Sequence, residues 1–145
     1  MEIDIPSTSV KTIDGKKKRV FTIKFTYRDW TNTVDKKLSN FIELNQVIKL
    51  IGRSINKPAP KFPKISRVKR LFRTLTESDY DNIRLNLLKY LKEVELSSLG
   101  KKAIFFQNFC GLPVVLRNDW SLGIFLTNPP KVLMPLFSNS NLVES

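Results

Sequence analysis

The hydrophobic period of this chain changes from two to that of a helix near residue 39. Over residues 21–25, FTIKF, apolar and polar side chains alternate, which predicts a half-buried strand. The turn signal Asp14-Gly15 precedes this strand, and a second turn region, 29–32, follows it. A further strand over 33–38 would complete an antiparallel meander of about three strands.

Helical spacing dominates the sequence after that point. Ser39 is a suitable N-cap for a helix that ends near Gly52. One face of this helix carries apolar residues at helical spacing: Phe41, Leu44, Ile48 and Ile51. The pair Thr76 and Asp79 resembles a capping box, with Asp in place of Glu, and predicts a second helix. A short apolar helix is expected over 101–110.

A proline-rich segment separates the two longer helices. Residues 57–64 read KPAPKFPK, and three prolines within six positions exclude a helix there. We therefore expect an extended, polyproline-II-like loop. The residues that follow it, 65–73, form the most positively charged segment of the chain together with Lys64.

The length of 145 residues suits one compact domain. We expect a partly flexible lead or frayed strand over 1–17 and the main domain over 18–110. Residues 111–137 are an apolar extension of unknown role, with a turn signal at Asn118-Asp119 between two expected strands. The polar residues 138–145 are expected to be a flexible tail.

Composition excludes several kinds of chemistry. The chain has no histidine and one cysteine, Cys110, so serine–histidine and cysteine–histidine nucleophiles are excluded, as is a histidine- or thiolate-based zinc site. Its five glycines are scattered and form no phosphate-binding loop. We expect no cofactor, no metal and no catalytic activity. The net charge of +12 predicts an anionic partner.

The order of these elements resembles the PX (phox homology) domain family over residues 18–110. The family sequence Arg-Arg-Tyr-Ser-Asp-Phe after the third strand has its counterpart in residues 36–41, KKLSNF. The family's proline loop resembles residues 60–64, PKFPK, and its later Arg–Leu–Tyr-Leu pattern resembles residues 84–91. The closing apolar helix resembles 104–106. The resemblance implies an α+β fold: a three-stranded antiparallel sheet, packed against a small helical subdomain with a proline-rich loop.

The resemblance also implies a function and a set of ligand residues. PX domains bind phosphoinositides on membranes, most often phosphatidylinositol 3-phosphate. Lys37, within the basic pair formed with Lys36, takes the position that binds the 3-phosphate. Lys64 approximates the lysine that contacts the 1-phosphate, Arg84 matches the arginine that holds the inositol hydroxyls, and Leu38 replaces the aromatic residue that packs against the ring. Lys at 37 keeps the charge but lacks the planar guanidinium fork, so the sequence does not decide which phosphoinositide is preferred.

The family also inserts its proline loop into the bilayer interface. Here that predicts a membrane-contacting segment with interleaved apolar and basic residues: Lys61, Phe62, Ile65, Arg67, Val68, Lys69, Arg70, Leu71 and Phe72. We therefore expect a peripheral protein on endosomal or vacuolar membranes that faces the reducing cytoplasm. No secretory signal or membrane-spanning run is apparent in the sequence.

Three other functions remain open at this stage. A PX-like scaffold could bind a protein partner and contact anionic lipid only weakly. A nucleic-acid-binding domain would also suit the positive charge, and a steep salt dependence of its affinity would reveal it, but no known nucleic-acid motif is present. Pro60–Pro63 formally matches a PxxP ligand of SH3 domains.

Overall fold

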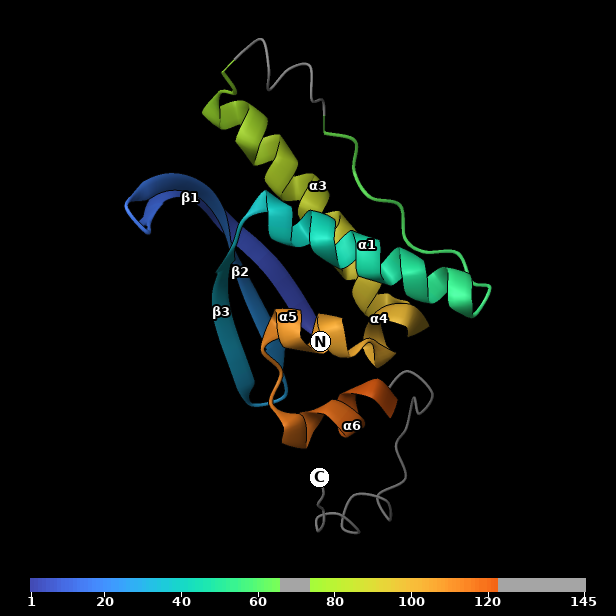
Figure 1. The fold of residues 1–145 in the computed structure, drawn as a ribbon. Helices are drawn as coiled ribbons and strands as arrows, with labels where there is room; N and C mark the ends of the chain where they lie inside the picture. Colours follow the sequence, from blue (N-terminus) through green and yellow to red (C-terminus); the bar gives the residue numbers. More distant parts are fainter. Residues whose placement is uncertain (66–73, 123–145) are drawn as a thin grey trace.

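The computed structural model describes residues 1–65 and 74–122, and in these ranges three strands precede the helices (Figure 1). The elements in chain order are β1 (Glu2–Ile13), β2 (Lys16–Tyr27), β3 (Trp30–Lys36), α1 (Leu38–Ser54), α3 (Glu77–Leu96), α4 (Ser98–Lys102), α5 (Ile104–Cys110) and α6 (Val114–Leu122). The predicted α+β class is confirmed.

The sheet is an antiparallel meander in the order β1-β2-β3, as predicted. Asp14 and Gly15 both have positive φ, 52° and 76°, which is the geometry of a tight two-residue hairpin. The second turn is shorter than expected, because Tyr27 pairs directly with Trp30 and only two residues connect the strands. Consequently β3 begins at Trp30, three residues before the predicted strand.

Of the two expectations for the N-terminal residues, a partly flexible lead or a frayed strand, the structure shows a strand, and it is paired at both ends. Glu2–Ile13 form β1, which pairs with β2 from Lys16 to Thr26, and Ile3 and Ile5 are buried in the core. These residues alternate with Glu2 and Asp4, so the period of two already begins at the N-terminus. The register shifts between Asp4 and Ser7, where Pro6 cannot donate a ladder hydrogen bond.

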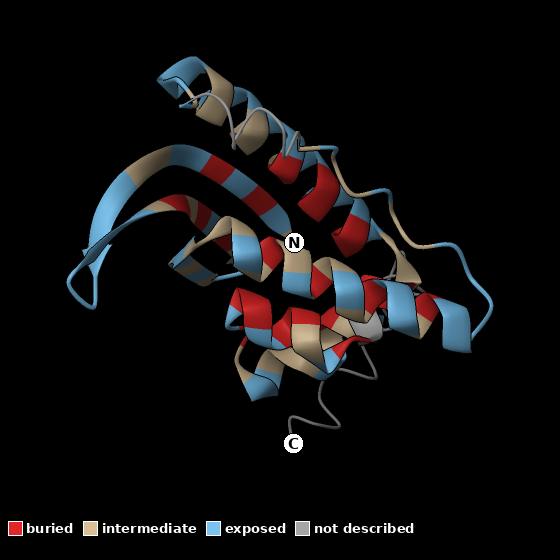
Figure 2. Cartoon of the chain, turned by 45° about the horizontal axis from the view of Figure 1, so that its top comes forward, coloured by how far each residue is buried: buried red, intermediate tan, exposed pale blue. Residues whose placement is uncertain are grey.

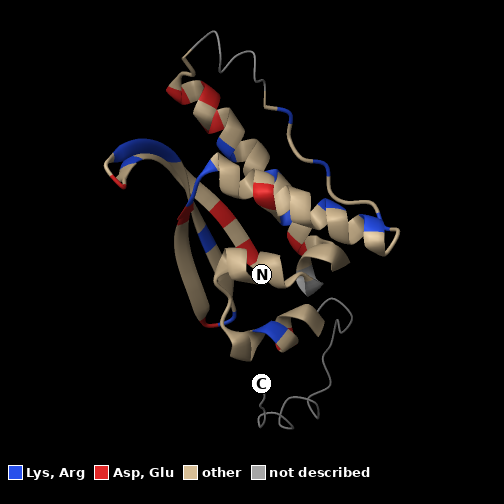
Figure 3. Cartoon of the chain, viewed as in Figure 1, with Lys and Arg blue, Asp and Glu red and all other residues tan. Residues whose placement is uncertain are grey.

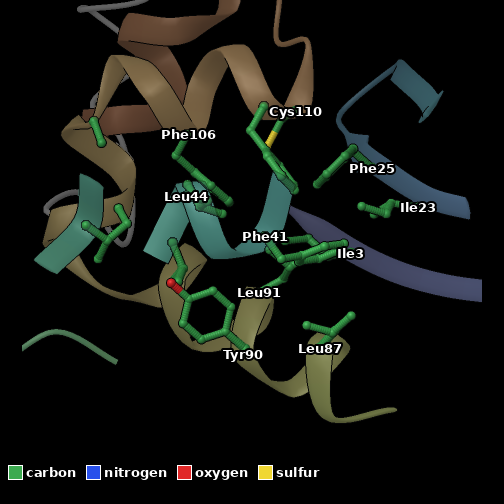
Figure 4. Close-up of a cluster of buried hydrophobic side chains, with 14 of the residues drawn as sticks. Ile3, Ile23, Phe25, Phe41, Leu44, Leu87, Tyr90, Leu91, Phe106 and Cys110 are labelled. Carbon is green, nitrogen blue, oxygen red and sulfur yellow. The ribbon is translucent and has the colours of Figure 1, made fainter. Parts of the chain in front are cut away.

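One hydrophobic core lies between the sheet and the helices (Figure 2). Phe41 of α1 is fully buried, and its ring meets Phe21 of β2 and Phe109 of α5 edge-on, at centroid distances of 6.0 and 5.5 Å. The close-up in Figure 4 shows how α1, α3, α5 and the strands contribute to this cluster. The apolar side of the strand predicted at 21–25 is buried, as are three residues of the helices; the buried residues are Phe21, Ile23, Phe25, Tyr90, Leu91 and Cys110.

Residues 114–122 are helical, so the strand predicted before the turn signal at Asn118-Asp119 is wrong, and the part of the second predicted strand beyond residue 122 lies outside the described residues. Gly111, at φ 70°, ends α5, and α6 runs over Val114–Leu122. Leu112, Leu116 and Trp120 recur every four residues and face the core. Packing of this stripe outweighs the strand preference of the two adjacent valines.

Contacts with the sheet also hold α6 in place. The Tyr27 hydroxyl donates a hydrogen bond to Asp119, whose carboxylate lies 2.9 Å from Arg28 Nη2. Burial, together with the hydrogen bond to Asp119, raises the pKa of Tyr27 to about 12. The packed unit therefore continues past the predicted boundary at residue 110 to at least residue 122. The remainder of the predicted extension and the tail lie outside the described residues.

Candidate functional site

The first predicted site residue, Lys37, is the N-cap of α1. Its backbone N–H donates to Asn40 Oδ1 at 2.8 Å, and its carbonyl accepts from the Asn40 N–H at 2.9 Å. The first turn of α1 contains no acidic residue, and within the described residues no carboxylate pairs with the Lys37 ammonium. A free ammonium beside the positive end of a helix dipole favours an anion. Leu38, beside it, is half-buried against the core.

Lys36 has a different environment from its neighbour. In the sheet register it lies opposite Phe21, on the side that faces the helices. Its Nζ is 4.9 Å from the centroid of the Phe109 ring, a cation–π contact. Of the predicted basic pair, only Lys37 is therefore held at the helix terminus, and Lys36 contributes to the packing of α5.

Arg84 belongs to α3, whose start is fixed by the predicted capping box. Thr76 Oγ1 accepts from the Asp79 N–H at 3.1 Å, and Asp79 Oδ2 accepts from the Thr76 N–H at 2.9 Å. Arg84 Nε donates to Asp81 Oδ1 at 2.8 Å, and Nη1 donates to the Ile5 carbonyl at 2.7 Å. The hydrogen bond from Arg84 lowers the pKa of the Asp81 carboxyl. Among residues 1–65 and 74–122, Nη2 has no acceptor, so a fixed guanidinium keeps one edge for a ligand.

A further arginine, not singled out by the sequence, lies along the same helix. Arg19 of β2 donates to both carboxylate oxygens of Glu77, at 3.2 and 2.5 Å, and its Cζ lies 4.0 Å from the centroid of the Tyr80 ring. The hydrogen bond from Arg19 lowers the pKa of Glu77. Arg19 is in phase with the core residues Phe21 and Ile23, so the strand period itself places it on the helix side. That phase was the signal available in the sequence.

The proline loop packs against the C-terminal half of α1. The Lys57 N–H donates to the Gly52 carbonyl at 2.8 Å, and a Cβ on Gly52 would lie 2.6 Å from the Lys57 carbonyl oxygen, so glycine permits this close approach. Between α1 and the loop lies an open groove of about 660 Å³. The groove is lined by four cations and no carboxylate; the cations are Lys49, Arg53, Lys57 and Lys61.

The predicted membrane-contacting residues divide into three groups. Phe62 is half-buried, and its ring meets Tyr90 edge-on at 5.0 Å, so the fold holds this side chain against the core and its role at the membrane stays a prediction. Packing on the core competes with membrane insertion for the Phe62 ring, because Tyr90 supplies an aromatic face next to the loop. Lys61 and Lys64 are exposed and Ile65 is half-buried. The others, Arg67, Val68, Lys69, Arg70, Leu71 and Phe72, lie outside the described residues.

The distribution of charged side chains in the described residues suits binding of an anion and offers no site for a metal ion (Figure 3). Figure 3 shows Lys and Arg on the β1–β2 hairpin, at the start of α1 and along the proline loop. The described part of the chain holds no group of three Cys, Asp or Glu side chains that could bind a metal ion. No described helix has the length and apolar content needed to cross a bilayer.

Comparison with known proteins identifies the fold. No family model matches the sequence, and no curated protein matches it. The X-ray structure of a designed CISK-PX domain superimposes with a TM-score of 0.62 at 17% sequence identity. The match covers 77% of this chain and 99% of that structure. The fold is therefore PX-like, as the sequence motifs predicted.

Proposed function

We propose that this chain is a phosphoinositide-binding module that attaches its protein reversibly to a membrane. The observation that carries the proposal is Lys37 at the start of α1 in a PX-like fold, which pairs with no carboxylate of residues 1–65 and 74–122, together with an Arg84 guanidinium fixed on α3. PX domains, which the sequence resembles at these positions, bind phosphoinositides. The proposed role is binding, without catalysis.

Each proposed contact follows from the chemistry of the headgroup. A phosphomonoester carries up to two negative charges and several acceptor oxygens, so the Lys37 ammonium and the N–H groups of the first turn of α1 are suitable donors for the 3-phosphate. The free edge of Arg84 would donate to the inositol hydroxyls. The exposed Lys64 would contact the 1-phosphate, and Leu38 would offer apolar surface to the ring. Phosphatidylinositol 3-phosphate is thus the first lipid to test.

The loop that follows the headgroup site would supply the membrane contact. Each basic residue near an anionic leaflet contributes about 1 kcal/mol, and insertion of apolar side chains adds to that. Ile65 and the segment 67–72 are the proposed contact, with Lys61 and Lys64 beside them. Endosomal or vacuolar membranes are the proposed location, because they carry the 3-phosphorylated lipid.

A second candidate function rests on the groove beside the proline loop. Four cations without a carboxylate would suit an acidic segment of a partner protein, as expected of a PX-like scaffold. This function predicts that a partner still binds after both headgroup residues are removed. The lipid function predicts the opposite for membranes.

The double variant Lys37→Ala/Arg84→Ala is expected to weaken binding to phosphatidylinositol 3-phosphate vesicles by about 100-fold or more, since each charged hydrogen bond contributes about 1.5–3 kcal/mol. The measurement is liposome co-sedimentation across all phosphoinositides at near-physiological salt.

The matched control is Lys24→Ala/Lys92→Ala, which removes the same charge from two exposed lysines on β2 and on the C-terminal half of α3. Because Arg84 also holds β1, Lys37→Ala alone provides a test that leaves that tether intact. Equal losses in the site variant and the control would mean that a nonspecific basic surface binds the vesicles.

A further inference from the structure

The contacts of Arg19 extend the proposed headgroup site, and the inference drawn from them rests on the proposed function. Arg19 stacks on Tyr80 and forms a two-pronged pair with Glu77, but its Nε is buried without a hydrogen-bond partner among the described residues. A fold-stabilising pair alone would not require a guanidinium that is mostly buried and incompletely hydrogen-bonded.

The sheet register brings Arg19 beside Lys37. Phe21 pairs with Lys36, so the backbone of Arg19, two residues before Phe21, lies next to the point where β3 turns into α1. Figure 3 shows the basic stretch of β2 passing close to the basic residues at the start of α1. The two cations therefore approach the same junction from neighbouring strands.

The spacing along α3 brings Arg19 near Arg84 as well. Glu77, Tyr80 and Arg84 recur at i, i+3 and i+7 and share one helix face. The rise between Tyr80 and Arg84 is about 6 Å, at 1.5 Å per residue, which is comparable with the width of an inositol ring bearing phosphates. Arg19, through its contact with Tyr80, and Arg84 thus lie along one face of α3, and the β2–β3 register brings the backbone of Arg19 toward the start of α1, where Lys37 is the N-cap.

Glu77 pairs with Arg19, and a stronger anion can displace the Glu77 carboxylate from this pair. The Glu77 side chain is 78% exposed, whereas that of Arg19 is 15% exposed. Glu77 can therefore rotate into water with little cost, while Arg19 stays fixed by the Tyr80 ring. A phosphomonoester offers more charge and more acceptor oxygens than one exposed carboxylate.

We propose that Arg19 binds a second ring phosphate, so that the site takes an inositol lipid with two phosphomonoesters, and that Glu77 holds the place of this phosphate when no lipid is bound. The shared chemistry is a bisphosphorylated inositol ring. It could be presented by a lipid or by the free headgroup, and the membrane lipid is the proposed source.

The test compares vesicles that contain phosphatidylinositol 3-phosphate with vesicles that contain each phosphatidylinositol bisphosphate. Arg19→Gln is expected to weaken binding to the preferred bisphosphate about tenfold or more and to leave binding to the monophosphate nearly unchanged. Glu77→Gln is expected to strengthen bisphosphate binding by up to about fivefold, because the competing carboxylate is gone.

Glu93→Gln is the matched control for charge, since Glu93 is an exposed residue of the same helix about four turns away. If Glu93→Gln strengthens binding as much as Glu77→Gln, the effect is one of net charge and the assignment of Arg19 is overturned. Glu77→Gln also keeps the proposal testable if Arg19→Gln fails to fold.

Soluble headgroups separate direct contact from membrane effects. The Arg19 and Glu77 effects must also appear in calorimetric titrations with free inositol phosphates of the two types; effects on vesicles alone would overturn the assignment. Wild-type binding that depends on Lys37 but not on Arg19 or Glu77 would reject this inference and leave the proposed function intact. A wild type that binds no phosphoinositide would reject both.

Discussion

Phe41→Ala is expected to lower the free energy of unfolding by about 3–5 kcal/mol, the range for removing a buried phenylalanine ring. Phe41 is fully buried and joins α1 to β2 and α5 through its contacts with Phe21 and Phe109. The cavity left by alanine would lie where the three elements meet. Urea denaturation followed by circular dichroism measures the loss.

Leu50→Ala is the control for this variant. Leu50 is on the same helix and is 60% exposed, so its truncation is expected to change the unfolding free energy by less than about 1 kcal/mol. If Phe41→Ala and Leu50→Ala had the same small effect, α1 would not pack on the sheet as the structure describes.

Trp120→Ala is the second substitution with a large expected effect, again about 3–5 kcal/mol. The indole is 1% exposed and lies 5.9 Å from the Phe106 ring, so it attaches α6 to α5. Thermal unfolding of this variant tests whether the domain includes residues beyond 110.

The control on α6 is Val115→Ala, because Val115 is 80% exposed and has little packing to lose. A Trp120→Ala protein as stable as Val115→Ala would contradict the docking of α6. It would restore the predicted boundary at the end of α5.

The sheet and the longer helices could be predicted because their sequence patterns and their packing agree. The alternation at 21–25 and the helical stripe Phe41, Leu44 and Ile48 each mark a face that the structure buries. The Thr76–Asp79 capping box is equally local, since both of its hydrogen bonds join residues three apart.

Helix α6 and the inward turn of Phe62 depend on contacts that no local pattern contains. The valines that begin α6 favour a strand in isolation, but Trp120 contributes more by packing on Phe106. Phe62 is adjacent to basic and proline residues, which is typical of a membrane loop. Its ring nevertheless packs edge-on against Tyr90, which lies 28 positions away in sequence. Such long-range partners appear only when the chain is folded.

The residues of the candidate site also divide into those that local motifs predict and those that depend on long-range contacts. Lys37 and Arg84 could be selected by their places in motifs, and each keeps a donor group that has no acceptor among the described residues. For Arg19 the strand period indicates only the helix-facing side, because its partners Glu77 and Tyr80 follow it by about 60 residues. Lys36 shows the converse. Its adjacency to Lys37 suggested a shared ligand role, but in the structure its ammonium lies over the Phe109 ring of α5.

The central claim, that a phosphoinositide headgroup binds at the start of α1 beside Arg84, is tested most directly by nuclear magnetic resonance. Isotope-labelled protein would be titrated with short-chain phosphatidylinositol 3-phosphate and then with the bisphosphates. We expect the largest shifts at the backbone amides of Leu38, Ser39 and Asn40 and at the Arg84 side chain. Shifts confined to the groove between Lys49 and Lys61, or no shifts with any of these lipids, would contradict the claim.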